Sequence, residues 1–181
     1  QFEKNADKPI SILHWGQSWW RCQANCGYQE FSAQRPQFDA MRRRGIIPLV
    51  DWSAWDSSAS RVGQPRFALQ KIIYGEHDAY IKRWAAAARG WGQPFFLRFN
   101  WEMNGDWFPW SERVNGNRSG QYVEAWRHVH DIFKAQGANN VTWVWCPNIV
   151  FPRAIPMDQL YPGDAYVDWT CLDGYNWGEG P

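Results

Sequence analysis

Glu102 is the side chain with the clearest potential for chemistry, because it follows a short apolar run and stands among tryptophans. The run Phe95–Phe99 has the length and composition of a buried strand. Trp101, Trp107 and Trp110 flank the carboxyl group in the sequence. A carboxyl group at the carboxyl end of a parallel strand, beside aromatic rings, is typical of the proton donor of a barrel that cleaves glycosidic bonds. The alternative is a Glu that caps a loop among core aromatics.

Arg98 is a second polar group on the same predicted strand. Its guanidinium lies deeper in the predicted sheet than Glu102 and can orient the site through forked hydrogen bonds. Polar and aromatic residues also follow the other predicted strands, and this enrichment at strand ends is typical of the functional face of a barrel. They are His14 and Trp15, Asp51 and Trp52, Trp145 to Asn148, and Asp173 to Asn176. We expect Asp51 and Asp173 to orient their neighbours through hydrogen bonds rather than to act as nucleophiles.

The elements that must position these side chains alternate between strands and helices. Such alternation predicts parallel β/α units, and five strands are too few to close an eight-stranded barrel. The expected fold class is therefore α/β, with a partial (β/α)8 TIM barrel of about five parallel strand-helix units. An open doubly wound sheet also gathers ligands at strand ends, but no Gly-rich phosphate loop follows any of these strands. The predicted strands are Ile10–Leu13, Ile46–Val50, Phe95–Phe99, Val141–Trp145 and Asp168–Asp173, the predicted helices are Phe31–Arg44, Ala79–Trp91 and Gln121–Gln136, and Ser53–Gln64 is predicted to be a loop.

The composition limits the kinds of partner. The chain has 181 residues and a formal net charge of +1, which gives no reason to expect a nucleic acid. No apolar run reaches the length of a membrane span. The 15 tryptophans are the compositional outlier, and indole rings stack well on sugars, although many must also fill the core. Because the chain opens at Gln1 without a Met, we expect a mature or trimmed form of a secreted protein.

The four cysteines give two different expectations. Cys22 and Cys26 lie in a short polar loop, where a small disulfide is typical of a secreted protein. A metal site is not expected, because no second pair with zinc-like spacing lies nearby. Cys146 and Cys171 end two apolar runs and are predicted to be buried thiols.

The segment Arg98–Trp110, with the sequence RFNWEMNGDWFPW, resembles a block of glycoside hydrolase family 26 that follows the fourth barrel strand. The resemblance implies that Glu102 is the general acid/base and that Trp107 forms a wall of the sugar site. The segments Val144–Asn148 and Leu172–Tyr175 are similar to the ends of the fifth and sixth strands of that family. By this similarity, the last residue of the second segment is the Tyr that hydrogen-bonds the nucleophile.

Two departures from the family pattern affect the interpretation. Trp101 stands where the family usually has a His that touches the sugar at the cleavage point, which leaves the substrate preference open. The nucleophilic Glu of the family follows the seventh strand, which the resemblance places beyond the last residue of this chain. Residues 1–181 are therefore interpreted as a single catalytic domain, incomplete at both ends, that lacks the first strand and the last two strands.

The resemblance implies a retaining glycoside hydrolase that cleaves β-mannan or mixed-linkage β-glucan by double displacement, without a cofactor or metal. The isolated chain is expected to be inactive and to pair with the missing remainder of the barrel or with another copy of itself. A non-catalytic carbohydrate-binding protein on a degenerate barrel stays open as the alternative. The expected catalytic residues are Glu102, Arg98 and Tyr175, and the residues expected to contact a polysaccharide or oligosaccharide are His14, Trp15, Trp52, Trp55, Trp101, Asn104, Trp107, Trp110, Trp145, Asn148 and Trp177.

Overall fold

A mostly parallel sheet organises the molecule. The computed structural model describes residues 2–60, 62–175 and 178. Their strands form one six-stranded sheet in the order β2-β1-β3-β4-β5-β6, in which every neighbouring pair is parallel except β1 and β2. The strands are β1 (Ile12–Cys22), β2 (Cys26–Tyr28), β3 (Ile47–Asp56), β4 (Phe95–Phe99), β5 (Val141–Trp145) and β6 (Trp169–Thr170). The helices are α1 (Phe2–Ala6), α2 (Phe31–Arg43), α3 (Leu69–Ile73), α4 (Asp78–Trp91) and α5 (Gln121–Ala135), with short 3-10 helices at Pro65–Phe67 and Met157–Gln159.

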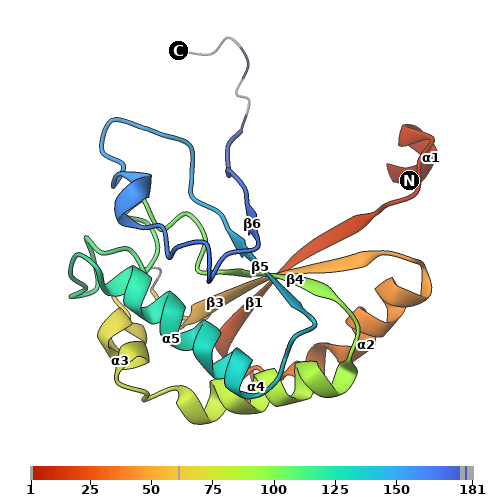
Figure 1. Ribbon diagram of the computed structural model, residues 1–181, viewed down its shortest axis with the longest axis horizontal. Coiled ribbons are helices and arrows are strands. Elements are labelled where there is room, and N and C mark those ends of the chain that lie inside the picture. Colours follow the sequence, from red (N-terminus) through yellow and green to blue (C-terminus); the bar gives the residue numbers. More distant parts are fainter. Residues whose placement is uncertain (1, 61, 176–177, 179–181) are drawn as a thin grey trace.

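Helices cover one face of this sheet. Figure 1 shows α2, α4 and α5 along the same side of the strands, while α1 stands apart near the N-terminus. Side chains alternate in direction along a strand, so every second residue points at these helices. On β4, Phe95, Leu97 and Phe99 are buried on the helix side. Arg98 points the other way, toward Asp51 of β3.

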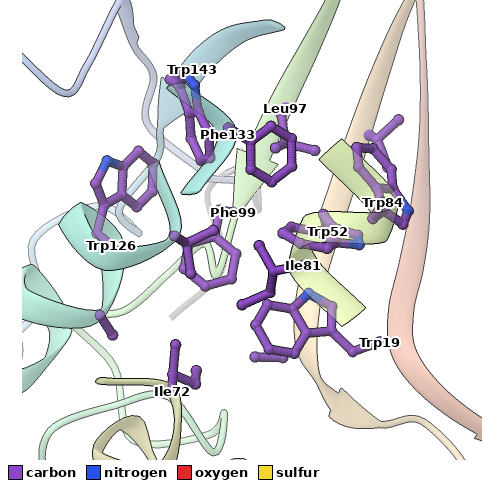
Figure 2. Close-up of a cluster of buried hydrophobic side chains, with 14 of the residues drawn as sticks. Trp19, Trp52, Ile72, Ile81, Trp84, Leu97, Phe99, Trp126, Phe133 and Trp143 are labelled. Carbon is purple, nitrogen blue, oxygen red and sulfur yellow. The ribbon is translucent and has the colours of Figure 1, made fainter. Parts of the chain in front are cut away.

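The core between the sheet and the helices is built mainly from large aromatic side chains. Figure 2 shows Trp52 and Phe99 of the sheet close to Trp84 of α4 and Phe133 of α5. The ring centroids of Trp52 and Trp84 are 4.9 Å apart, and those of Trp52 and Phe133 are 5.6 Å apart. Much of the unusual tryptophan content therefore serves packing.

The predicted α/β class with parallel strand-helix units is confirmed, but two strands are longer than expected. β3 continues to Asp56, whereas the sequence predicts a loop from Ser53 onward. β1 continues to Cys22 instead of ending at Leu13. The two extensions pair with each other in parallel, with Ser18 opposite Ser53. Each extension supplies the backbone hydrogen-bond partners of the other. The composition of these residues does not predict that pairing.

The hairpin of β1 and β2 is missing from the predicted set of strands. The two strands pair antiparallel, with Trp20 opposite Tyr28 and Cys22 opposite Cys26. The expected disulfide between Cys22 and Cys26 is confirmed, and it closes the turn of this hairpin. The sheet therefore carries one antiparallel strand at its edge beside β1.

The prediction of buried thiols at Cys146 and Cys171 is wrong, because the two form a disulfide. Trp145, the last residue of β5, lies opposite Thr170, the last residue of β6. The residue that follows each of them in the sequence is a cysteine. Parallel pairing thus joins residues that are 25 positions apart in the sequence. The bond ties the short edge strand β6 to its neighbour at the end where the candidate site lies.

Candidate active site

Glu102 lies where the chain leaves the carboxyl end of β4. Its φ of +52° is in the left-handed region, which is unfavourable for a residue with a Cβ. Two backbone hydrogen bonds hold this conformation. The N–H of Glu102 donates to the Cys146 carbonyl over 2.8 Å, and the N–H of Gly105 donates to the Glu102 carbonyl over 3.1 Å. A strained residue that its surroundings hold in place is typical of a functional site.

Both oxygens of the Glu102 carboxyl group have a fixed donor. The indole Nε1 of Trp107 donates to Oε2 over 2.7 Å, and the Nδ2 of Asn148 donates to Oε1 over 2.8 Å. Glu102 is half-buried, so the carboxyl group is still reached from solvent. Each carboxylate oxygen keeps a second lone pair for another partner. The group is therefore held in one orientation and can still accept a hydrogen bond from a bound molecule.

Arg98 is the centre of a charged cluster on the face of the sheet away from the helices. Its Nε and Nη2 donate to the two oxygens of Asp51 over 2.5 and 2.6 Å, and its Nη1 donates to Asp173 over 3.2 Å. Asp51 is also hydrogen-bonded to His14. The structure thus shows the forked interaction expected of Arg98. Both aspartates orient the guanidinium, and the cluster links β1, β3 and β4 to the chain after β6.

Burial by itself lowers the pKa of the Arg98 guanidinium. The hydrogen bonds to Asp51 and the negative charges of Asp51, Asp173 and Glu102 outweigh burial, so the pKa of Arg98 lies above the ordinary value for arginine. Arg98 therefore stays cationic and supplies a permanent positive charge to the surroundings of Glu102.

Four of the predicted sugar-binding tryptophans are partly exposed, namely Trp15, Trp55, Trp101 and Trp107. Trp55 and Trp101 line a hollow of about 320 Å³ whose walls also include Ser18 and Ser53. Flat aromatic rings together with a few hydroxyl groups are a suitable lining for a sugar ring. The structure therefore brings together aromatic and polar groups at the strand ends next to Glu102.

Trp52, Trp145 and Trp15 lie on strands and face the helices, and the prediction of a sugar contact is wrong for the two that are buried, Trp52 and Trp145. Trp52 is 0% exposed and Trp145 is 7% exposed. The indole N–H of Trp145 donates to the Leu160 carbonyl over 3.1 Å. Trp15 packs edge-on against Phe38 of α2, with ring centroids 5.0 Å apart. The buried rings of Trp52 and Trp145 have no free face for a pyranose, whereas Trp15 is half-buried and its sugar contact stays a prediction.

Trp110 and Asn104 are also buried, and the prediction of sugar contacts is wrong for both. Each is 0% exposed. The indole N–H of Trp110 donates to the Trp101 carbonyl over 2.7 Å. The side chain of Asn104 bonds to the backbone of Asn148 at both its oxygen and its nitrogen. These residues shape the loops that carry Glu102 instead of touching a ligand.

The remaining predicted residues lie as follows. His14 has a side chain that is 52% exposed and belongs to the Arg98 cluster. Tyr175 is 67% exposed. Trp177 lies outside the described residues, so its role stays a prediction. Phe151, whose ring lies next to Trp107, is not predicted from the sequence, because a lone Phe in an irregular loop carries no periodic signal.

Comparisons with known proteins agree with this geometry. Residues 53–179 match the model of glycosyl hydrolase family 26. The chain belongs to this family. It is 36% identical to Endoglucanase H of Acetivibrio thermocellus, in an alignment that covers 98% of this chain and 18% of that protein. It is also 34% identical over 80 residues to Mannan endo-1,4-beta-mannosidase A and B of Caldalkalibacillus mannanilyticus, which covers 41% of this chain and 15% of that protein.

Solved structures of the family share the fold. A β-mannanase from a symbiotic protist of the termite Reticulitermes speratus, complexed with gluco-manno-oligosaccharide, matches with a TM-score of 0.68 and 19% identity over 96% of this chain and 58% of that chain. The family 26 β-mannanase BoMan26A of Bacteroides ovatus matches with a TM-score of 0.65 and 19% identity over 92% of this chain and 53% of that chain. The chain thus spans somewhat more than half of these structures, and its sheet is a partial TIM barrel.

Two further findings concern residues 2–60, 62–175 and 178. Within them, no three His, Cys, Asp or Glu side chains are grouped so that they could hold a metal ion. No helix in that part of the chain combines the length and the hydropathy needed to span a bilayer.

Proposed function

We propose that this chain is the acid/base-bearing part of a retaining, endo-acting β-glycanase. The observation that carries the proposal is the carboxyl group of Glu102, held at a strand end by Trp107 and Asn148. Membership of glycosyl hydrolase family 26 supports a glycosidase over a parallel α/β domain of another kind. Arg98, with its permanent charge and its hydrogen bonds to Asp51 and Asp173, fixes the surroundings of that carboxyl group.

Glu102 would act once as an acid and once as a base. In the first step its carboxyl group gives a proton to the glycosidic oxygen as the bond to the anomeric carbon breaks, while a second carboxylate bonds to that carbon. In the second step the Glu102 carboxylate takes a proton from water, and the water oxygen displaces the second carboxylate. The two carboxyl groups of a retaining site lie about 5–5.5 Å apart.

We place the nucleophilic carboxylate outside residues 1–181, next to Tyr175 in the completed site. Asp51 is 3% exposed and is paired with Arg98 and His14, so it is a poor nucleophile. Asp173 also pairs with Arg98. The polypeptide that completes the barrel, or a second copy of the chain, is the partner that this proposal requires. Residues 1–181 alone should bind sugar weakly and hydrolyse it negligibly.

The substrate we propose is a β-linked polysaccharide, either mixed-linkage β-glucan or β-mannan. The match to Endoglucanase H covers 98% of this chain, whereas the match to the mannosidase covers 41%, which favours the glucan. Trp101 in place of the His that is usual in the family leaves β-mannan open as the second substrate. A polysaccharide is degraded outside the cell, and the two disulfides suit that compartment.

The deciding experiment uses a polypeptide that contains residues 1–181 and the rest of the barrel. It compares the Glu102→Gln variant of this polypeptide with its wild type. Cleavage of barley β-glucan and of mannan is measured beside the first turnover of an activated aryl glycoside. We expect polysaccharide cleavage to fall about 10²–10⁴-fold, because a poor leaving group needs the proton. The first step on the aryl glycoside should be spared, because a good leaving group does not. Glu76→Gln is the control, since Glu76 pairs with Lys71 on the surface.

The outcomes of this experiment distinguish the possible roles of Glu102. Equal losses on both substrates would assign Glu102 as a nucleophile or a structural residue and would overturn the proposed role. A wild-type protein that binds both polysaccharides but cleaves neither would be the non-catalytic binding protein considered as the alternative.

A further inference from the structure

The loop Ile149–Ile155 is held at both ends by one buried residue. The Nδ2 of Asn104 donates to the Asn148 carbonyl over 2.8 Å, and the Asn148 N–H donates to the Oδ1 of Asn104 over 2.8 Å. At the other end, the Ile155 N–H donates to the Asn104 carbonyl over 2.9 Å. Asn104 is 0% exposed. The loop is therefore fixed to the segment that carries Glu102, only two residues along the chain from Asn104.

This loop presents apolar side chains to solvent. Val150 is 77% exposed, Ile149 is 44% exposed, and Phe151 is half-buried. The Ile149 N–H donates to the Asp173 carbonyl over 3.0 Å. Its side chain lies so close to Gly174 that a Cβ there would meet the Cγ2 of Ile149 at 2.5 Å. Apolar groups that are ordered and exposed side by side mark a surface that a ligand or partner covers.

Phe151 connects this surface to Glu102 through Trp107. The ring centroids of Phe151 and Trp107 are 5.3 Å apart, and the two planes are inclined by 39°. We call this pair the aromatic corner. The indole N–H of Trp107 is already engaged by Glu102, so Trp107 offers a partner its carbon surface only. A pyranose has apolar C–H faces that suit such a surface, and a ring bound there would lie next to the proton donor.

We propose that Phe151 is a sugar-contacting residue and that the aromatic corner binds one pyranose ring of the β-linked chain beside the scissile bond. The inference rests on the proposed role of Glu102. The aromatic corner contacts the Glu102 carboxyl group through the Trp107 N–H. This contact favours a sugar over a protein segment as the occupant. The hollow lined by Trp55 and Trp101 is a separate aromatic surface near Glu102, so the corner adds a second place for the chain to be held.

The test measures binding without turnover, by calorimetric titration of the polypeptide that contains residues 1–181 and the rest of the barrel. This polypeptide carries Glu102→Gln and is titrated with β-1,4-linked cello- and manno-hexaose and with a mixed-linkage glucan oligosaccharide. Adding Phe151→Ala should weaken binding about 2- to 12-fold, as expected for the loss of one aromatic contact. Phe151→Leu, which keeps apolar packing against Trp107 but has no ring, should weaken binding to a similar extent. Phe151→Trp should restore it. Phe2→Ala is the matched control, because Phe2 is 67% exposed on the distant α1.

The inference is overturned if Phe151→Ala and Phe151→Leu bind all three oligosaccharides as tightly as their parent. If Glu102→Gln also blocks polysaccharide cleavage in that case, the proposed function stands and only the corner is wrong. If the parent binds none of the oligosaccharides and the completed wild-type barrel cleaves no polysaccharide, the proposed function itself fails. Loss of affinity in the Ala and Leu variants, with recovery in the Trp variant, supports the corner whatever the fate of the catalytic assignment.

Discussion

The two sides of strand β3 make opposite use of the same kind of sequence. On the helix side, Val50, Trp52 and Ala54 are each 0% exposed and belong to a continuous apolar core. On the other side, Asp51 is tied to Arg98, and Trp55 lines an open hollow. Adjacent residues thus face the packed core and the open side of the sheet in turn, because successive side chains of a strand point to opposite faces.

Tryptophan shows the contrast most clearly. Trp84 contributes volume to the core, and its buried indole N–H meets no acceptor among the described residues. At the rim, Trp107 contributes its N–H to Glu102. The composition shows an unusual number of indole rings, but only the place of each ring in the fold decides whether its volume or its N–H matters.

The largest effect that this contrast predicts is on folding. Trp52→Ala removes a fully buried ring that contacts Trp84 and Phe133, and we expect the free energy of unfolding to fall by about 3–5 kcal/mol. Trp107→Ala should cost much less, because Trp107 is partly exposed. Urea unfolding followed by circular dichroism measures both. Equal losses in the two variants would contradict a division of tryptophans between core and rim.

Strand alternation also explains where the predicted positions of side chains differ from the structure. The boundaries of β4 and β5 agree with the sequence, since apolar runs define them. The sequence places Trp52 and Trp15 at strand ends, because the residues that continue β3 and β1 do not have a strand pattern. Once β3 extends to Asp56, alternation alone places Trp52 with the core and Trp55 at the rim. The errors thus follow from strand length, which pairing with a neighbour decides and local composition does not.

Long-range contacts set the other limit to prediction from sequence. The disulfide between Cys146 and Cys171 depends on the register of β5 and β6, which no local pattern reveals. No local pattern singles out His77, and it is 3% exposed and hydrogen-bonded to Tyr28 and to the Arg66 carbonyl. Predicting this disulfide and the burial of His77 requires knowledge of which distant segments of the chain are in contact.

The second prediction compares the two covalent links. If a disulfide acts mainly by restricting the unfolded chain, its contribution grows with the separation of its cysteines. That relation gives ~3.5 kcal/mol for Cys146–Cys171, at a separation of 25, and ~2 kcal/mol for Cys22–Cys26, at a separation of 4. Double Cys→Ser variants at each pair should lower the free energy of unfolding in that order. The reverse order would show that the β1–β2 hairpin depends more on its disulfide than the site end of the sheet does.

The third prediction concerns the support of Trp107. A Cβ at Gly105 would lie 2.4 Å from the Cη2 of Trp107, so Gly105→Ala must displace the indole ring from Glu102. Losing a hydrogen bond to a charged group costs about 1.5–3 kcal/mol, and kcat/KM on polysaccharide in the completed barrel should fall about 10- to 100-fold. Gly90→Ala is the matched control, because nothing lies within 4 Å of a Cβ at Gly90. Similar kcat/KM values for the two variants would show that the Trp107 hydrogen bond does not matter for catalysis.

The smallest effect concerns the pH dependence of folding on the helix-covered side. Burial lowers the pKa of His77, and the hydrogen bond to the Arg66 carbonyl opposes this only in part. The unfolded chain therefore binds a proton at His77 more readily than the folded protein does. Stability should fall as the pH drops below about 6.5, with a slope of at most about 1.4 kcal/mol per pH unit from this residue.

His77→Gln removes the titrating ring, so its free energy of unfolding should change less between pH 7 and pH 5 than that of wild type. The lowered pKa values of Asp78 and Glu3 belong to a more acidic range, because a carboxylate with a lowered pKa loses its stabilising charge only below its ordinary value near 4. Tyr28→Phe is the control, since it removes the hydrogen bond to His77 but keeps the imidazole. If the free energy of unfolding changes equally with pH in His77→Gln and in wild type, burial of His77 does not govern the acid sensitivity of the core. The helix-covered side would then have no pH-sensitive group at His77 to set against the charged cluster of the other side.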